Sequence, residues 1–325
     1  MLMKKVIRYF RMTLLLVVMT GMVGSCVKEK ISTSAAGTAN IIVRLDSRAP
    51  GSETTADDNA LLNEGINSVR LILVQEGKIV VNQLFDGLSG ENAPLLEKGF
   101  QIKGLEKKPT DFYAVVNETN IGANISNVNN IESELNQTFT GFPCVYSDNV
   151  FLPMYGKSLD QNIFHGANIG ISVTRAVARI DLSIENLTGS SLNISSVDFG
   201  PFFADKGFLV SSEGDGITYD SKSFDDFGDI ENGENAIKRY YLYEAFDQVK
   251  VPYTSFTIEL KSGEFVYENK QIEVSDNEEK QNLLKRNTVL KINATISKSP
   301  SNVTCATINC TVAPWEAVDL GPTFE

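Results

Sequence analysis

The chain has 325 residues, 42% of them hydrophobic, which suffices to bury the cores of about two domains and argues against a disordered protein. The formal net charge of -12 at pH 7 disfavours nucleic acid and anionic membrane surfaces as partners, because an acidic protein repels both. With one histidine, His165, the sequence disfavours a histidine-based metal cluster, and a Ser-His-Asp site would have to use that residue.

Residues 1–25 have the pattern of a signal peptide. Four basic residues open the chain: Lys4, Lys5, Arg8 and Arg11. The uncharged segment that follows, residues 12–24, is shorter than the about 20 residues that a membrane-spanning helix needs. It ends in the sequence VGSC at residues 23–26, which resembles a bacterial lipobox. That resemblance implies cleavage before Cys26 and acylation of its thiol, and two or three acyl chains give a stable anchor.

Residues 27–50 combine a charged tether, a strand and a turn. Ile41, Val43 and Leu45 occupy alternate positions, which predicts a strand with one apolar face. The sequence SRAP at residues 47–50 has the composition of an accessible turn, where a protease could cut between Arg48 and Ala49. Arg44 is an alternative cut site, four residues earlier.

The next part of the chain predicts four strands and one short helix. The strands are expected at residues 66–75, 78–85, 100–105 and 111–117. Glu76 and Gly77 form the turn of a hairpin between the first two strands. Residues 118–142 are rich in asparagine, and four of their apolar residues have helical spacing. These are Ile125, Val128, Ile131 and Leu135. We therefore expect a loop with one short amphipathic helix.

Two segments near the middle of the chain have contrasting patterns. Residues 150–157 contain Pro153 and Gly156, which predicts an extended edge segment with a turn. Residues 171–187 form the longest alternating run of the chain, and they predict one strand with a bulge near Arg175.

The second half of the sequence predicts strands separated by turns. The strands are expected at residues 192–199, 239–245, 255–260, 265–274, 287–297 and 302–315. Turn signals recur about every ten residues, which is typical of an antiparallel β-sandwich. No long amphipathic helix alternates with these strands, so the pattern disfavours an α/β fold.

Cysteines and acidic residues leave alternatives open. Cys305 and Cys310 would form a disulfide if the chain between them turned, but on one straight strand they would face opposite sides and could not pair. The acidic segment at residues 213–234 is either a solvated loop or a calcium site, although its spacing does not match an EF-hand. The sequence contains no GxSxG, P-loop or GxGxxG motif, so we expect no enzymatic activity, metal or other cofactor.

Several segments taken together resemble the fimbrillin family, the lipoprotein subunits of type V pili. They are the lipobox and residues 47–50 (SRAP), 111–117 (DFYAVVN), 153–156 (PMYG), 173–180 (VTRAVARI), 240–244 (YYLYE), 285–287 (KRN) and 314–315 (PW). The resemblance implies an all-β fold with two transthyretin-like antiparallel β-sandwich domains, at residues 49–168 and 169–325. The signal peptide, residues 1–25, and a tether with a removable first strand, residues 26–48, would precede them.

The resemblance also implies a mechanism. An outer-membrane lipoprotein precursor, acylated at Cys26, reaches the cell surface, and an Arg-specific protease cuts it after Arg48. The strand that contains Ile41, Val43 and Leu45 then leaves its groove, and a C-terminal strand of a neighbouring subunit replaces it. The donor strand would lie within residues 311–324. Its apolar anchors would be Val312, Trp315, Val318, Leu320 and Phe324.

The partners implied are other fimbrial subunits, either copies of this chain or tip and anchor proteins, and no nucleic acid. A fimbrial tip or anchor is an alternative role. A second alternative is a glycan-binding lipoprotein of the outer-membrane surface, whose usual mark is a flat platform of exposed aromatic side chains.

Overall fold

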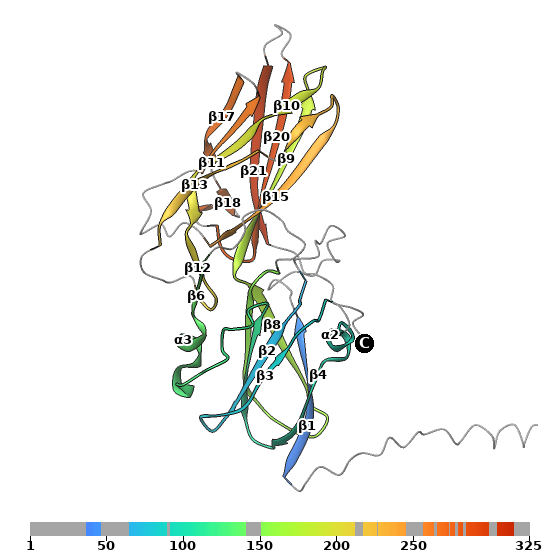
Figure 1. The fold of residues 1–325 in the computed structure, drawn as a ribbon, viewed down its shortest axis with the longest axis vertical. Helices are drawn as coiled ribbons and strands as arrows, with labels where there is room; N and C mark the ends of the chain where they lie inside the picture. The colour runs from blue at the N-terminus through green and yellow to red at the C-terminus, as the bar shows by residue number, and fades with distance from the viewer. Residues whose placement is uncertain are drawn as a thin grey trace, which may run out of the picture. The chain divides into compact units, whose positions relative to one another are not determined.

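The computed structural model describes residues 37–46, 65–89, 92–140, 151–211, 217–225, 227–244, 256–262, 265–272, 274–276, 279–281, 284–298 and 304–314 (Figure 1). The chain divides after Gly37, and every element named below belongs to the unit Thr38–Glu325. Strands predominate in the described ranges. The helical elements within the described ranges are α2 (Pro94–Lys98), α3 (Ile131–Leu135) and the 3-10 turn η2 (Val128–Asn130). The predicted all-β class is confirmed.

One sheet encloses the first core. Its order is β3 (Lys78–Phe85), β2 (Val69–Gln75), β5 (Thr110–Val116), β7 (Met154–Gln161), β8 (Asn168–Arg175), β1 (Thr38–Asp46) and β4 (Phe100–Glu106). β8 divides its pairing: residues 168–172 run parallel to β1, and residues 173–175 pair antiparallel with β7. The sheet therefore folds over at β8. Side chains from both parts, such as Val43 and Leu71, meet in one buried cluster, the first core.

β2 is buried on both faces, which explains its nearly continuous run of apolar residues. Leu71 and Leu73 point into the first core. Ile72, on the opposite face, belongs to a separate cluster that Ile131 and Leu135 of α3 cover. These two residues are four positions apart and therefore share one face of the helix. The predicted helix is present but shorter than expected, because the residues before Ile131 form η2.

Two four-stranded sheets form the second sandwich. One has the order β15 (Asn235–Tyr243), β9 (Val177–Leu187), β20 (Thr288–Lys298) and β21 (Thr304–Pro314). The other has the order β13 (Tyr219–Phe224), β11 (Ser196–Ala204), β16 (Phe256–Ser262) and β17 (Phe265–Ile272). Alternate residues of β9, such as Ile180 and Leu182, pack with Phe199 of β11 in a second core. The pattern of alternating burial follows the period of two that a strand imposes.

Three two-stranded sheets complete the described elements. They are β10 (Leu192–Ile194) with β14 (Gly228–Ile230), β6 (Thr138–Thr140) with β12 (Lys206–Phe208), and β18 (Val274–Asp276) with β19 (Glu279–Gln281).

Two sequence predictions need correction. The run at residues 171–187 is not one bulged strand: it contains the end of β8 and all of β9, which pair in different sheets on either side of Ala176. The segment with Pro153 and Gly156 is not at an edge, since β7 lies between β5 and β8. Gly156 is required there, because a Cβ atom on it would lie 2.3 Å from the backbone oxygen of Ser172 in β8.

The chain passes from the first core to the second within a few residues. Along β8 and β9, Val177 still contacts the first core, whereas Ala178 belongs to the second. The domain boundary expected between residues 168 and 169 stays a prediction.

Candidate functional site

β1 is the first described strand, and it lies inside a sheet. It pairs antiparallel with β4 on one side and parallel with β8 on the other (Figure 1). The chain continues from β1 to β2 through residues 47–68, of which 47–64 lie outside the described ranges. A break in residues 47–64 would therefore leave β1 attached to the rest of the fold by noncovalent contacts alone.

Alternate side chains of β1 enter the first core. Ala39, Ile41 and Val43 are at most 1% exposed, and the half-buried Leu45 packs against the same cluster. The three residues predicted to anchor a removable strand, Ile41, Val43 and Leu45, thus share the core-facing side. Full burial of one isoleucine or valine side chain contributes about 1.5–3 kcal/mol, so this face holds the strand by several kcal/mol.

Polar contacts along the edges of β1 determine its register. Gly104 N donates to Asn40 Oδ1 at 3.1 Å, and Gly166 N donates to the backbone oxygen of Asn40 at 2.8 Å. Ile42 N donates to the oxygen of Ala167 at 2.9 Å. A shift of one residue would turn the Asn40 side chain into the core, so these contacts and the apolar face favour the same register.

Gly99 gives β1 room to approach β4. A Cβ atom on Gly99 would lie 2.4 Å from Ile42 Cγ2 and 3.0 Å from the backbone oxygen of Val43. The φ angle of Gly99 is 82°, a conformation that favours glycine. The alternation of apolar residues in the sequence does not single out Asn40, Gly99 or Gly104. The one available signal was a glycine directly after the short helix α2, a common position for a helix C-cap.

The predicted donor segment begins inside β21. Residues 311–314 pair with β20, and Val312 lies opposite Leu290. β21 is at the end of its sheet. The other predicted anchors, Trp315, Val318, Leu320 and Phe324, lie outside the described residues.

The two C-terminal cysteines lie on one continuous strand. Cys305 is opposite Ser297, and Cys310 is opposite Ile292, with an unbroken register between them. Five residues of a strand span about 16 Å, whereas the Cα atoms of a disulfide are at most about 7 Å apart. The straight-strand alternative is therefore the one observed, and the hairpin that a Cys305–Cys310 disulfide needs is not formed.

The proposed processing sites are placed as follows. Cys26, Arg48 and Ala49 lie outside the described residues. Arg44 lies within β1, opposite Gly170 of β8, and its side chain is exposed. A protease would have to separate β1 from β8 before it could bind the chain around Arg44, because the strand is already paired there.

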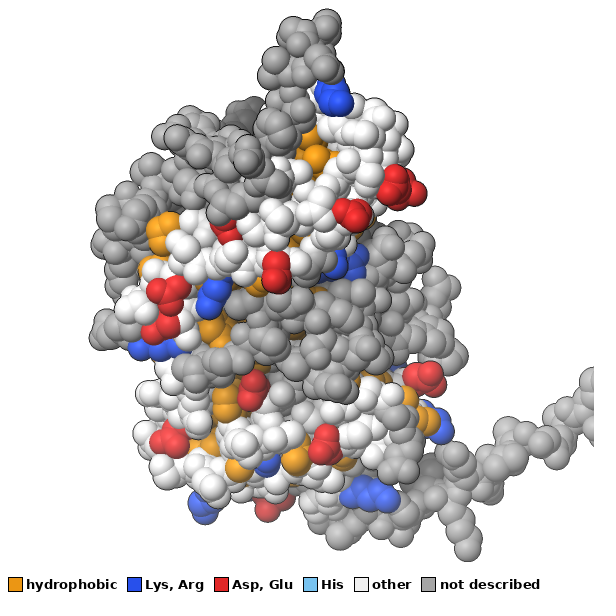
Figure 2. Space-filling view, turned by 45° about the horizontal axis from the view of Figure 1, so that its top comes forward, with side chains coloured by type: hydrophobic (Ala, Val, Ile, Leu, Met, Phe, Trp, Pro, Cys, Tyr) orange, Lys and Arg blue, Asp and Glu red, His pale blue; other side chains and the backbone are white. Residues whose placement is uncertain are grey.

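The described surface carries no aromatic platform. Figure 2 shows hydrophobic side chains in small separate patches, interspersed with charged side chains of both signs. Among the aromatic residues whose side chains are described, Phe164 alone is mostly exposed, at 61%. The described residues therefore lack the feature that would favour a glycan-binding surface.

The described ranges contain neither a cluster of metal ligands nor a membrane-spanning helix. In these ranges, no three His, Cys, Asp or Glu residues are grouped as a metal ion would require. Asp229, in the described part of the acidic segment, accepts a hydrogen bond from Asn193 Nδ2 at 2.6 Å. No helix in the described part of the chain has the length and apolar character needed to span a bilayer.

Comparison with known proteins identifies the fold. No protein-family model and no curated protein sequence matches the chain. The tip fimbrial protein Mfa3 from Porphyromonas gingivalis, solved with a C-terminal truncation, has a TM-score of 0.61 and 14% identity, over 86% of this chain and 100% of that one. A candidate cell adhesion protein from Parabacteroides distasonis has a TM-score of 0.56 and 15% identity, over 87% of this chain and 98% of that one.

A third solved structure is similar as well. The fimbrilin FimA from Porphyromonas gingivalis has a TM-score of 0.50 and 14% identity, over 87% of this chain and 98% of that one. At these identities the likeness concerns the fold alone. The β-sandwich fold that the resemblance to fimbrillins implied is confirmed.

Proposed function

We propose that this chain is a structural, non-catalytic subunit of a cell-surface fimbria, and that β1 occupies a position that a strand of a neighbouring subunit later takes. The observation that carries the proposal is the place of β1. It is a buried apolar strand between β4 and β8, and only the segment after Asp46 joins it to the rest of the fold. Its departure would expose two strand edges and the pockets of Ala39, Ile41 and Val43.

Acylation of Cys26 would hold the precursor at the outer membrane, and cleavage by an Arg-specific protease would release it. Arg48 is the better cut site, because Arg44 is paired in β1 whereas Arg48 lies beyond the last residue of that strand. A cut after Arg48 would detach the whole of β1 together with the lipid. Release of the anchor and opening of the groove would then be a single event.

The sequence after β21 repeats the pattern of β1. Both segments have apolar residues at four alternate positions: Ala39, Ile41, Val43 and Leu45 in β1, and Val318, Leu320, Pro322 and Phe324 near the C-terminus. In this register Asp319 takes the place of Asn40. Its carboxylate would accept the N–H of Gly104 that Asn40 accepts in β1. The register thus matches the apolar face of the groove and the acceptor for Gly104 N, while Pro322, in the place of Val43, brings no N–H to the ladder.

Physical chemistry supports a strand that keeps the groove filled until release. An open edge beside an apolar groove is an aggregation hazard, and β1 covers it in the precursor. After release, each subunit would offer a groove at one site and a donor strand at another. Head-to-tail contacts of this kind do not close on themselves, so they build a filament.

Substitution of the cut site tests the release step. The variant Arg48→Ala should leave the full-length precursor in the membrane fraction and prevent the formation of filaments, as observed by electron microscopy. The matched variant Arg44→Ala removes the other arginine and should be processed and polymerised normally. Normal polymers from Arg48→Ala would contradict cleavage at this site.

Deletion of residues 315–325 tests donation without shortening β21, which ends at Pro314. The truncated subunit should accept a donor strand but not supply one, so it should cap chains when mixed with the intact subunit. Electron microscopy should then show shorter filaments as the truncated fraction rises. Undiminished filament length would refute a donor role for this segment and would favour a tip or anchor position.

The register has its own test. Asp319→Ala removes the acceptor proposed for the N–H of Gly104 and should weaken binding between subunits, whereas Asp319→Asn restores an acceptor and should restore binding. Equal binding by both variants would refute the register while leaving donation by residues 315–325 intact.

A further inference from the structure

A short strap from the second half of the chain crosses to the first half. We define the strap as residues 206–211, which comprise β12 and the three residues after it. Lys206 and Phe208 pair antiparallel with Thr140 and Thr138 of β6. The hydrogen bonding continues beyond β12, since Leu209 N donates to the oxygen of Gln137 at 3.4 Å. The strap thus lies alongside residues 137–140, the segment that follows α3, and is hydrogen-bonded to it.

Leu209 anchors the strap in apolar surroundings. Its side chain is 0% exposed and belongs to the cluster on the outer face of β2. Ile72 and Val115 of the first sheet, together with Leu135 of α3, form that cluster with it. A residue of the second half thereby completes an apolar layer of the first half, and its full burial stabilises the contact.

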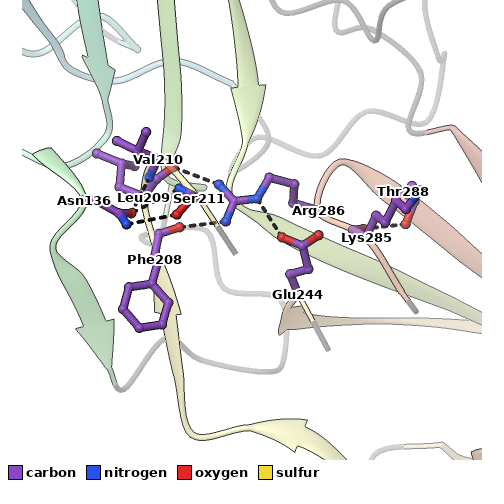
Figure 3. Close-up of polar contacts among 9 residues, drawn as sticks. All are labelled: Asn136, Phe208, Leu209, Val210, Ser211, Glu244, Lys285, Arg286 and Thr288. Carbon is purple, nitrogen blue, oxygen red and sulfur yellow. Dashed lines mark hydrogen bonds and ion pairs between the residues drawn. The ribbon is translucent and has the colours of Figure 1, made fainter. Parts of the chain in front are cut away.

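Asn136 holds the strap from the side of the first sandwich (Figure 3). Its Oδ1 accepts hydrogen bonds from Val210 N at 3.1 Å and Ser211 N at 3.0 Å. Its Nδ2 donates to Ser211 Oγ at 3.0 Å. One side chain thus forms three hydrogen bonds with two consecutive residues of the strap.

Arg286 holds the strap from the side of the second sandwich (Figure 3). Its Nη1 donates to the oxygen of Leu209 at 2.9 Å, and its Nη2 donates to the oxygen of Phe208 at 3.0 Å. Its Nε lies 2.8 Å from Glu244 Oε2, and both side chains are less than a fifth exposed. The planar guanidinium makes these three contacts from three separate nitrogens held in a fixed geometry, whereas a lysine has a single nitrogen.

Apolar contacts reinforce the connection. The first core contains Tyr241 and Tyr243 of β15 and Val289 of β20, although both strands belong to the second sandwich. The two cores are therefore linked at several points.

We propose that the strap is a lock that makes the two sandwiches one cooperative folding unit. Its use rests on the proposed function: when β1 leaves, the first core loses Ala39, Ile41 and Val43, and the second sandwich keeps the opened first sandwich folded through the strap. The coupling itself does not depend on cleavage or polymer growth. A test on the intact chain therefore separates the failure of this proposal from the failure of the proposed function.

Hydrogen exchange across a urea titration tests the lock on the full chain, purified in mild detergent. Peptides from β2 and β5 report on the first sandwich, and peptides from β9 and β20 report on the second. In the unsubstituted chain we expect all four to lose protection at one urea midpoint. In the variant Asn136→Ala/Leu209→Ala we expect two midpoints. At urea concentrations between the two midpoints, the rates of amide exchange in the two sandwiches should differ by about tenfold.

A control removes the same residue types away from the strap. The variant Leu192→Ala/Asn193→Ala deletes one buried leucine of the second core and one side-chain hydrogen bond between β10 and β14. It should lower the midpoint and keep it common to both sandwiches. Two midpoints in the unsubstituted chain, or one shared midpoint in Asn136→Ala/Leu209→Ala, would overturn the proposal.

A milder variant decides the question if the double variant does not fold. Arg286→Lys keeps the positive charge beside Glu244 but replaces the rigid fork of guanidinium donors, which reaches Phe208 and Leu209 from two separate nitrogens, with a single ammonium group. The difference between the urea midpoints of the two sandwiches should be smaller in Arg286→Lys than the difference expected for the double variant. A single shared midpoint in Arg286→Lys would then overturn the lock.

Discussion

Removal of the isoleucine side chain at position 41 should loosen β1 without altering its chain connections. Ile41 is 1% exposed and lies in the first core. An isoleucine-to-alanine change at such a site costs about 2–5 kcal/mol, through lost burial and the cavity that remains. Since about 1.4 kcal/mol corresponds to a factor of ten, Ile41→Ala should weaken retention of the strand by at least about 30-fold.

The assay follows the strand after its covalent link is cut. An Arg-specific protease cleaves the purified chain, and gel filtration with mass spectrometry then measures how quickly the fragment that contains β1 dissociates. Ile42→Ala is the matched control, because it makes the same change at the next residue, whose half-buried side chain points away from the core.

The two variants should differ clearly. Ile42→Ala loses less buried area, so we expect its fragment to dissociate less than about tenfold faster than the unsubstituted one. Equal dissociation of the Ile41→Ala and Ile42→Ala fragments would show that the core-facing side does not hold the strand, and it would refute the reasoning behind the removable strand.

Three further predictions concern the stability of the intact chain, measured by urea unfolding. Gly156→Ala should lower the free energy of unfolding by at least about 2 kcal/mol, because the new Cβ would meet the oxygen of Ser172. Gly170→Ala has open space and should change that free energy by less than about 0.5 kcal/mol. Similar free energies of unfolding for the two variants would contradict the close approach of β7 and β8 at Gly156. Burial raises the pKa of Glu118, so its charged form is disfavoured in the folded chain. This penalty begins as pH rises above the unfolded pKa of the carboxyl group and is complete once pH exceeds the raised folded pKa. Glu118→Gln should therefore stabilise the chain at pH 7 and have no effect below about pH 4, and an effect independent of pH would refute this cause. Asn117→Asp retains the acceptor for two backbone N–H groups but loses the donor to two backbone oxygens. It should therefore lower the free energy of unfolding by about 1–3 kcal/mol. An unchanged urea midpoint would argue against that hydrogen-bonding role.

Local signals in the sequence were enough to predict some elements residue by residue. The predicted strand at residues 78–85 coincides with β3. Its start is determined by a turn in which Glu76 and Gly77 both have positive φ angles, of 49° and 70°. Such a turn connects the strands of a tight hairpin, and glycine is a strong signal for it.

The division between β8 and β9 shows where local signals become ambiguous. Odd-numbered residues such as Val173 are buried in β8, and even-numbered residues such as Ile180 are buried in β9. The phase of the alternation changes near Ala176. A bulge and a passage from one sheet to another produce the same change of phase, and only the partners of the two strands distinguish them.

The candidate site was predictable on one side only. The apolar face of β1 follows from alternation within a few residues. The polar edge does not, because Gly104, which donates to Asn40, is 64 positions away in the sequence. The place of Gly156 was misjudged for a related reason, since a glycine suits both a strand edge and a close approach between strands.

The divided pairing of β8 has a consequence for any strand that binds beside it. Residues 173–175 pair with β7, and this pairing does not involve β1. Residues 168–172 belong to the same strand, β8, so the pairing with β7 would still hold them in place if β1 were absent. An edge of this kind is preorganised: the incoming strand loses its own conformational freedom, while the receiving edge has little left to lose. If a strand replaces β1, part of its affinity would therefore originate in β7, which holds the receiving edge in place.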